Sequence, residues 1–180
     1  MEQIKSLLAD RDTTIARDLN LNFERLLAGE KLEPKEAALA VLATARSVGY
    51  DELAKAARER LRAMEVAPEE IREGEESAAI MGMLNTYYKF RSFIFKVGEE
   101  KQTDYAQAGL RMTSLARPVL GKVQFEMLAF AVSIVNGCET CVVSHENVLR
   151  EAGVPHEKIH ELVRIASVVK ALKTLSEVAA

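Results

Sequence analysis

The sequence has no tryptophan, four prolines and only two cysteines among its 180 residues. No stretch approaches the ~20 consecutive apolar residues that a membrane-spanning helix needs. Residues 1–5, MEQIK, lack the basic start and apolar core of a secretory signal peptide. These absences argue against a membrane protein and a secreted protein, and they predict a cytoplasmic location.

Charge is also close to balanced, with 24 Lys and Arg residues against 27 Asp and Glu and a formal net charge of −3. A protein that binds nucleic acid needs a basic surface for the phosphates, so we expect no nucleic-acid partner. Apolar residues make up 48% of the chain and charged residues 28%, as in an ordinary globular protein. The length suits one domain with a real core.

The two cysteines lie three positions apart, in the segment Cys138-Glu139-Thr140-Cys141. A disulfide between them closes too short a loop to stabilise a whole fold. In a reducing compartment such a pair indicates either redox catalysis or metal binding.

Apolar residues recur at helical spacing through most of the chain, and no alternating strand pattern is found. Gly29 is expected to end one helix, and Pro34 to lie in the first turn of the next. Asn136-Gly137 ends a later helix, Cys138 begins another, and Gly153 marks its end. The sequence therefore predicts an all-α fold.

A weak internal repeat relates residues 66–71, VAPEEI, to residues 154–159, VPHEKI, 88 positions later. Residues 36–39 resemble 126–129 if the offset shifts by two. Chance similarity between amphipathic helices is the alternative, but the match extends over several helices. We predict a single domain over 1–180, with a degenerate half at about 1–96, a loop at 96–105 and an active half at about 106–180. Val48 and Asp51 would then lie roughly where the active half has its cysteines.

Glu126 and His145 complete a constellation around the two cysteines. Cys138, Cys141 and His145 follow helical spacing and share one face. A peroxide is attacked by a thiolate, which the N-terminus of a helix favours. His145 lies four positions after Cys141 and can accept its proton, while the Glu126 carboxylate can orient or charge the imidazole.

After the attack, the sulfenic acid is captured by the second thiol, which gives a Cys138–Cys141 disulfide and water. An external dithiol then restores both thiols by exchange. The residues alone leave the attacking cysteine open. Cys138 lies nearest the helix start, where thiols are often more acidic, whereas Cys141 has the histidine at i+4, and we favour Cys141.

Zinc is the main alternative, because Cys138, Cys141, His145 and Glu126 offer four possible ligands. Structural zinc sites usually recruit a second pair of cysteines, and the chain has none, so we favour redox use and expect no metal.

The aromatic and basic run at residues 87–95 is interpreted as a packed helix rather than a nucleic-acid platform. His156 and His160 are expected to lie outside the site.

The pattern Glu126-x(11)-Cys138-x-x-Cys141-x(3)-His145 resembles the signature of the AhpD alkylhydroperoxidases, within the carboxymuconolactone decarboxylase superfamily. The flanking segments 130–133, 136–138, 79–83 and 109–112 are also similar to that family. The resemblance covers nearly the whole chain and is weakest over the first thirty residues. It implies an AhpD-like all-α fold of two similar helical halves, of which only the C-terminal half carries the CxxC site. It also implies that the protein assembles as a homotrimer.

The resemblance also implies an antioxidant thiol peroxidase that reduces alkyl hydroperoxides without a bound cofactor. Its electron donor would be dihydrolipoamide, carried on a lipoylated dihydrolipoamide acyltransferase, and it would also reduce the peroxiredoxin AhpC. Cys141 corresponds to the cysteine that forms the sulfenic acid and the mixed disulfide with AhpC. Cys138 corresponds to the proton donor and disulfide partner, and Glu126 and His145 correspond to the rest of a proton relay.

One position departs from the family pattern. Characterised members can have a histidine immediately before the second cysteine, where this chain has Thr140, which does not titrate near neutral pH. A disulfide reductase adapter for AhpC with little peroxidase activity of its own is therefore the alternative function. A non-redox enzyme such as a decarboxylase ranks last, because it has no use for the cysteine pair.

Overall fold

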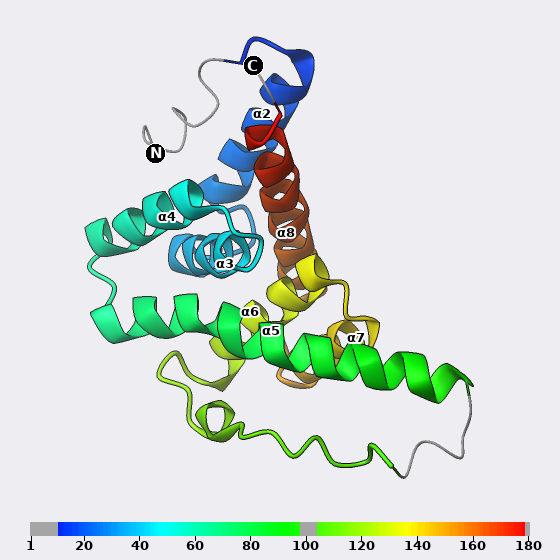
Figure 1. Cartoon of the computed structure of the whole chain (residues 1–180). Helices are drawn as coiled ribbons and strands as arrows, with labels where there is room; N and C mark the ends of the chain where they lie inside the picture. Colours follow the sequence, from blue (N-terminus) through cyan, green and yellow to red (C-terminus); the bar gives the residue numbers. More distant parts are fainter. Residues whose placement is uncertain (1–10, 98–103, 179–180) are drawn as a thin grey trace.

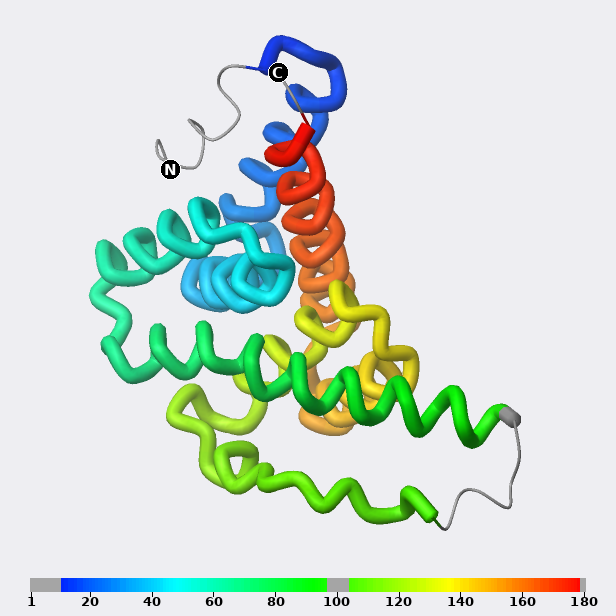
Figure 2. The backbone as a smooth tube through the Cα atoms, in the orientation of Figure 1, coloured from blue at the N-terminus to red at the C-terminus, as the bar shows by residue number. Residues whose placement is uncertain are grey.

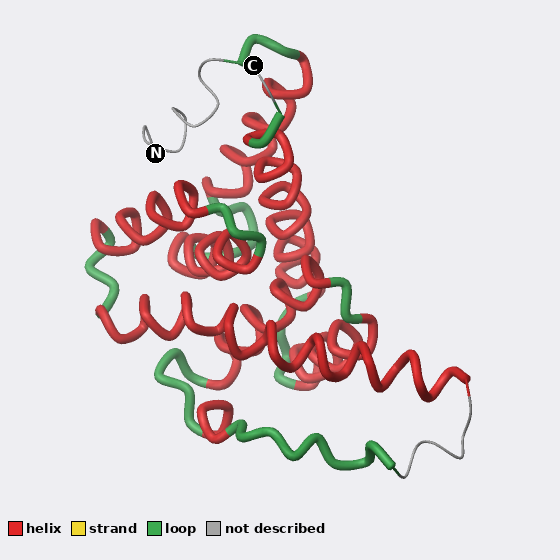
Figure 3. The backbone as a smooth tube through the Cα atoms, viewed as in Figure 1, coloured by secondary structure: helices red, strands yellow, loops and turns green. Residues whose placement is uncertain are grey.

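The computed structural model describes residues 11–97 and 104–178, which form seven α-helices, one 3-10 helix and no strand (Figures 1 and 3). The all-α prediction is confirmed. No helix in these ranges combines the length and apolar character needed to cross a lipid bilayer. The helices, labelled as in Figure 1, are α2 (Thr14–Ala28), α3 (Pro34–Ser47), α4 (Asp51–Ala63), α5 (Pro68–Val97), η2 (Thr113–Ala116), α6 (Lys122–Asn136), α7 (Glu139–Glu151) and α8 (His156–Ser176).

Helix α3 lies at the centre and packs against α4, α5, α6 and α8. Its residues 37–45 are all buried, and five of the nine are alanine, whose small side chain lets neighbouring helices approach from several directions. A helix that is apolar all round belongs in a core. Pro34 at its first turn and a capping box between Glu33 and Glu36 fix where it begins.

The predicted repeat is visible in the helices. Helices α3, α4 and α5 begin at positions 34, 51 and 68, and α6, α7 and α8 begin at 122, 139 and 156, in each case 88 residues later. The turns repeat as well. Gly49 and Gly137 have φ of 71° and 65°, and Glu65 and Gly153 have φ of 57° and 79°. The prediction of two similar helical halves is confirmed.

The register corrects two details of the sequence analysis. At the constant offset of 88 residues, the counterparts of Cys138 and Cys141 are Tyr50 and Leu53 rather than Val48 and Asp51. The counterpart of Glu126 is Ala38, because the offset does not shift by two within α6. The weak similarity of residues 36–39 to 126–129 is therefore not part of the repeat.

The predicted loop at 96–105 is only partly described. Lys96 and Val97 still belong to α5, and residues 98–103 lie outside the described residues. The following segment, residues 104–121, runs back alongside α5 (Figure 2). The Tyr87 hydroxyl donates to the Gln107 carbonyl at 3.2 Å, and the amides of Val119 and Leu120 donate to Glu73 at 2.8 and 2.7 Å. These bonds hold the 104–121 segment against α5.

Glu75 of α5 joins α3 and α4, because it lies 2.5 Å from the guanidinium of Arg46 and 2.6 Å from that of Arg58. Burial raises the pKa of Glu75, but the hydrogen bonds from Arg58 and Arg46 outweigh burial, so this pKa lies below its usual value. A carboxylate with a lowered pKa stabilises the fold above its unfolded pKa of ~4.3, and this contribution is lost as pH falls through the folded value.

We therefore expect Glu75→Gln to lower the free energy of unfolding by about 1–3 kcal/mol at pH 7, since each hydrogen bond to a charged group contributes about that much. The gap between wild type and variant should narrow as pH falls through the acid range, which urea titrations at several pH values would measure. Glu76→Gln is the matched control, because Glu76 is exposed on the same helix. An equal loss in both variants, or a gap that does not depend on pH, would contradict this role for Glu75.

Candidate active site

The two cysteines lie at the start of α7, directly after the turn that follows α6. Gly137 takes the left-handed conformation that ends α6, and Cys138 is the N-cap residue of α7. Cys141 lies one turn further on, its Cα 5.3 Å from that of Cys138, and the two sulfurs form a disulfide. This Cα separation is within the usual range for disulfides. The segment can therefore form the disulfide without rearrangement of the helix.

His145 and Glu126 meet beside the cysteines, as predicted. His145 lies one turn after Cys141 on α7, and its Nδ1 is 2.6 Å from Oε2 of Glu126 on α6. Each side chain is about a fifth exposed, at 19% and 20%. With Nδ1 donating to the carboxylate, a neutral imidazole has Nε2 free to accept a proton. The structure thus brings all four predicted residues to the contact between α6 and α7.

The cysteines differ in their access to solvent. Cys138 is fully buried, whereas Cys141 is 6% exposed and lines a cavity of about 300 Å³. The cavity lies between α5, α7 and the 104–121 segment, and its walls are mostly apolar: Met81, Leu84, Tyr88, Met112, Leu115, Thr140, Cys141, Ser144 and His145. A molecule in the cavity therefore meets Cys141 and His145 together, with Cys138 behind them.

The apolar wall was missed by the sequence analysis. Nothing in the sequence placed Met81, Met112 or Leu115 beside Cys141. These residues come from α5 and from the 104–121 segment, far from the CxxC motif in the chain. Only the return of the 104–121 segment along α5 brings them to the site.

The backbone around the cysteines favours negative charge on sulfur. The first-turn amides of α7, including that of Cys141, have no acceptor within the helix, and this end of a helix carries partial positive charge. This helix end favours the thiolate form that reacts with peroxides. Two lysines of α5 bond to residues that flank Cys138 in the chain: Lys89 Nζ donates to the Asn136 carbonyl at 2.6 Å, and Lys96 pairs with Glu139 at 2.9 Å.

The equivalent positions of the N-terminal half carry no such chemistry. At the 88-residue offset, the four site residues correspond to side chains that are all buried in the core: Ala38, Tyr50, Leu53 and Ala57. Three of the four are aliphatic and have no atom that titrates. The four reactive side chains therefore belong to the C-terminal half alone, whereas α5 of the N-terminal half contributes to the cavity wall.

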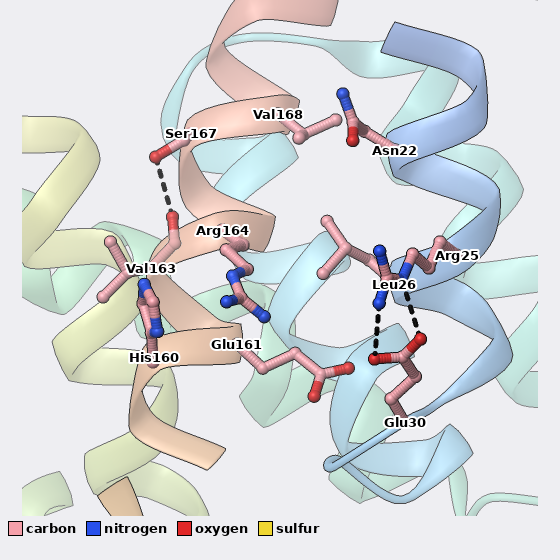
Figure 4. Close-up of a pocket in the computed structure, with 10 residues that line it drawn as sticks. All are labelled: Asn22, Arg25, Leu26, Glu30, His160, Glu161, Val163, Arg164, Ser167 and Val168. Carbon is pink, nitrogen blue, oxygen red and sulfur yellow. Dashed lines mark hydrogen bonds and ion pairs between the residues drawn. The ribbon is translucent and has the colours of Figure 1, made fainter. Parts of the chain in front are cut away.

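Within residues 11–97 and 104–178, no group of three or more His, Cys, Asp or Glu side chains is arranged so that it could hold a metal ion. Another cavity, of about 550 Å³, lies between α2 and α8 (Figure 4). It is lined by charged residues that include Arg25, His160 and Glu161, and by no cysteine. The carboxylate oxygens of Glu161 are sealed from solvent and accept no hydrogen bond within the described ranges. This cavity is separate from the thiol site.

Comparisons with known proteins show what the whole chain is similar to. The profile of the carboxymuconolactone decarboxylase family matches residues 102–180, which include both cysteines. The chain is similar to "Alkyl hydroperoxide reductase AhpD" of Anaeromyxobacter dehalogenans (strain 2CP-1), with 41% identity over 91% of this chain and 86% of that protein. It is also similar to proteins of the same name from Streptomyces coelicolor, at 36% identity over 96% and 92% of the two chains, and from Mycobacteroides abscessus, at 34% over 94% and 91%.

The contact between His145 and Glu126 predicts how Cys141 responds to pH. In a Cys138→Ser background, replacing His145 by Gln removes the group that we expect to accept the Cys141 proton, so alkylation of Cys141 by iodoacetamide should move to higher pH. At pH 7 we expect the rate to fall about tenfold or more, because only the thiolate reacts. His156→Gln is the matched control, since His156 is exposed on α8 and pairs with its neighbour Glu157. Superimposable pH profiles for His145→Gln and the control would refute the assignment.

Proposed function

Because the chain belongs to the AhpD family of alkyl hydroperoxide reductases, within the carboxymuconolactone decarboxylase superfamily, we propose that it is a thiol peroxidase in its own right. Its substrates are alkyl hydroperoxides, and it acts through a dithiol–disulfide cycle of Cys138 and Cys141. The asymmetry between the two cysteines carries the proposal: Cys141 lies on a cavity beside His145, and Cys138 is buried within bonding distance behind it.

The cycle begins with both cysteines reduced. His145 accepts the Cys141 proton, and Glu126 stabilises the resulting imidazolium through its hydrogen bond to Nδ1. The thiolate attacks one peroxide oxygen, the O–O bond breaks, and the alkoxide takes a proton from the relay to leave as an alcohol. Cys141 is now a sulfenic acid. The Cys138 sulfur attacks it, water leaves, and the disulfide forms.

Two electrons and two protons must then return to the cysteines. We propose dihydrolipoamide as their source, carried on a lipoylated dihydrolipoamide acyltransferase, with no cofactor bound to this chain. A lipoamide thiolate attacks Cys141, its second thiol releases it, and lipoamide disulfide leaves. The apolar wall of Met81, Leu84 and Met112 suits the hydrocarbon of either an alkyl hydroperoxide or a lipoyl chain. The same sulfur would form the mixed disulfide with AhpC.

We place this cycle in the cytoplasm and in a homotrimer, as in the family that the sequence resembles.

Thr140 favours a second candidate function. It lines the cavity beside Cys141, where characterised relatives can have a histidine, and its hydroxyl supplies no proton near neutral pH. Slower release of the alcohol would leave disulfide exchange intact and make the protein chiefly a disulfide reductase adapter for AhpC.

The test measures consumption of cumene hydroperoxide with dihydrolipoamide as the only reductant. We expect turnover in the wild type, loss to background in Cys138→Ser and Cys141→Ser, and unchanged turnover in Ser167→Ala, since this serine of α8 donates to the Val163 carbonyl of its own helix. One equivalent of peroxide should consume two thiols, and dihydrolipoamide should restore both. Full activity in both cysteine variants would refute the proposal.

The same proteins distinguish the adapter function. In that case Cys138→Ser traps a mixed disulfide with AhpC through Cys141, while peroxide turnover by the wild type without AhpC stays negligible. Failure of AhpC to form that disulfide, together with rapid direct turnover, would favour the peroxidase.

A further inference from the structure

A cluster of polar side chains lies beneath the turn that carries Cys138. The Asn85 amide donates to Ser133 Oγ at 2.9 Å, and the Asn136 amide donates to Asn85 Oδ1 at 2.9 Å. Ser47 Oγ donates to Asn136 Oδ1 at 2.9 Å, and Lys89 Nζ donates to the Asn136 carbonyl at 2.6 Å. We call these five residues the asparagine cluster. They link α3, α5 and α6 at Asn136, two positions before Cys138.

The cluster is buried at its centre. Asn85 is 1% exposed and Ser133 is fully buried. Buried amides and hydroxyls are costly unless they are hydrogen-bonded, and here the Asn85 side chain uses both its amide and its carbonyl. A satisfied buried network holds its members in one arrangement. Asn136 is therefore fixed on its side chain by two helices and on its carbonyl by Lys89.

The internal repeat provides a comparison within the same molecule. The backbone turn at 133–138 recurs at 45–50, where the Tyr50 amide donates to the Ala45 carbonyl at 2.8 Å, as the Cys138 amide does to the Ser133 carbonyl at 3.1 Å. Gly49 and Gly137 share the left-handed conformation. Yet the counterparts of Ser133 and Asn136 are Ala45 and Val48. The turn thus forms without polar side chains, so the asparagine cluster is not needed to make it.

We propose that Asn85 and Asn136 are positioning residues that hold the Cys138 turn in one place in both the dithiol and the disulfide states. The inference rests on the thiol cycle proposed above. Two thiols form a disulfide more readily when the fold keeps them close, because less freedom is lost in bringing them together. Cys138 is fully buried, so the packing around it restricts where its sulfur can lie relative to Cys141. If the turn moved, the effective concentration of the Cys138 thiol near Cys141 would fall.

The experiment measures the equilibrium of the Cys138–Cys141 pair with dithiothreitol and its cyclic disulfide. In it, two protein thiols give up two electrons and two protons to the cyclic disulfide, which becomes the dithiol. Alkylation of the remaining thiols and mass spectrometry give the oxidised fraction. We expect Asn85→Ala and Asn136→Ala each to lower the equilibrium constant for the protein disulfide about tenfold, which corresponds to a potential about 30 mV less negative.

The double variant should match the single variants, since both remove the same network. Ser77→Ala is the matched control, because Ser77 is also a buried hydroxyl on α5 but donates to the Gly74 carbonyl of its own helix. Lys89→Met tests the partly buried edge of the cluster with less risk to folding, and we expect a shift in the same direction of about threefold. Circular dichroism and urea unfolding report stability separately.

Wild-type potentials in folded Asn85, Asn136 and Lys89 variants would overturn the proposal, even if their unfolding free energies fall, because the cluster would then only support the fold. If the asparagine variants do not fold, Lys89→Met alone decides the outcome. The measurement uses no peroxide. Shifted potentials in a protein without peroxidase turnover would therefore refute the proposed function and leave this inference standing.

Discussion

The left-handed turn at Gly137 is the constraint on which the site depends. It ends α6, returns the chain so that α7 packs against α6, and leaves Cys138 at the N-cap of the new helix. From that point helical geometry sets the rest: Cys141 follows after one turn and His145 after another. Because α6 and α7 lie side by side, Glu126 on the first reaches His145 on the second at 2.6 Å. A displaced turn would separate the relay from the sulfurs.

The same turn serves two purposes in the two halves. At Gly49 it leads into α4, which buries Leu53 and Ala57 in the apolar core. At Gly137 it leads into cysteines, a histidine and a cavity. At this turn the asymmetry is one of side chains rather than of backbone, since the helices that follow start at the same offset. The positions after the turn therefore supply packing surface in one half and reactive groups in the other.

Local features of the sequence predicted much of this. Gly29, Pro34 and Gly137 act within a few residues, so their effect on helix ends is independent of the rest of the fold. The spacing of Cys138, Cys141 and His145 needs only one helix. The register of the repeat was wrong at Val48 and Asp51, because a four-residue similarity at 36–39 carries too little information to fix an offset.

Contacts between segments that are distant in the chain could not be predicted from the sequence. The apolar wall combines Leu84 of α5 with Leu115 of η2, and Asn85 meets Ser133 across 48 positions of the chain. Neither pairing leaves a periodic signal. Even so, these contacts decide the order of events in the proposed cycle. Cys138 is buried and Cys141 lines the cavity, so in the proposed cycle the peroxide, the reductant and the partner thiol all react at the Cys141 sulfur. These reactions must therefore occur one after another.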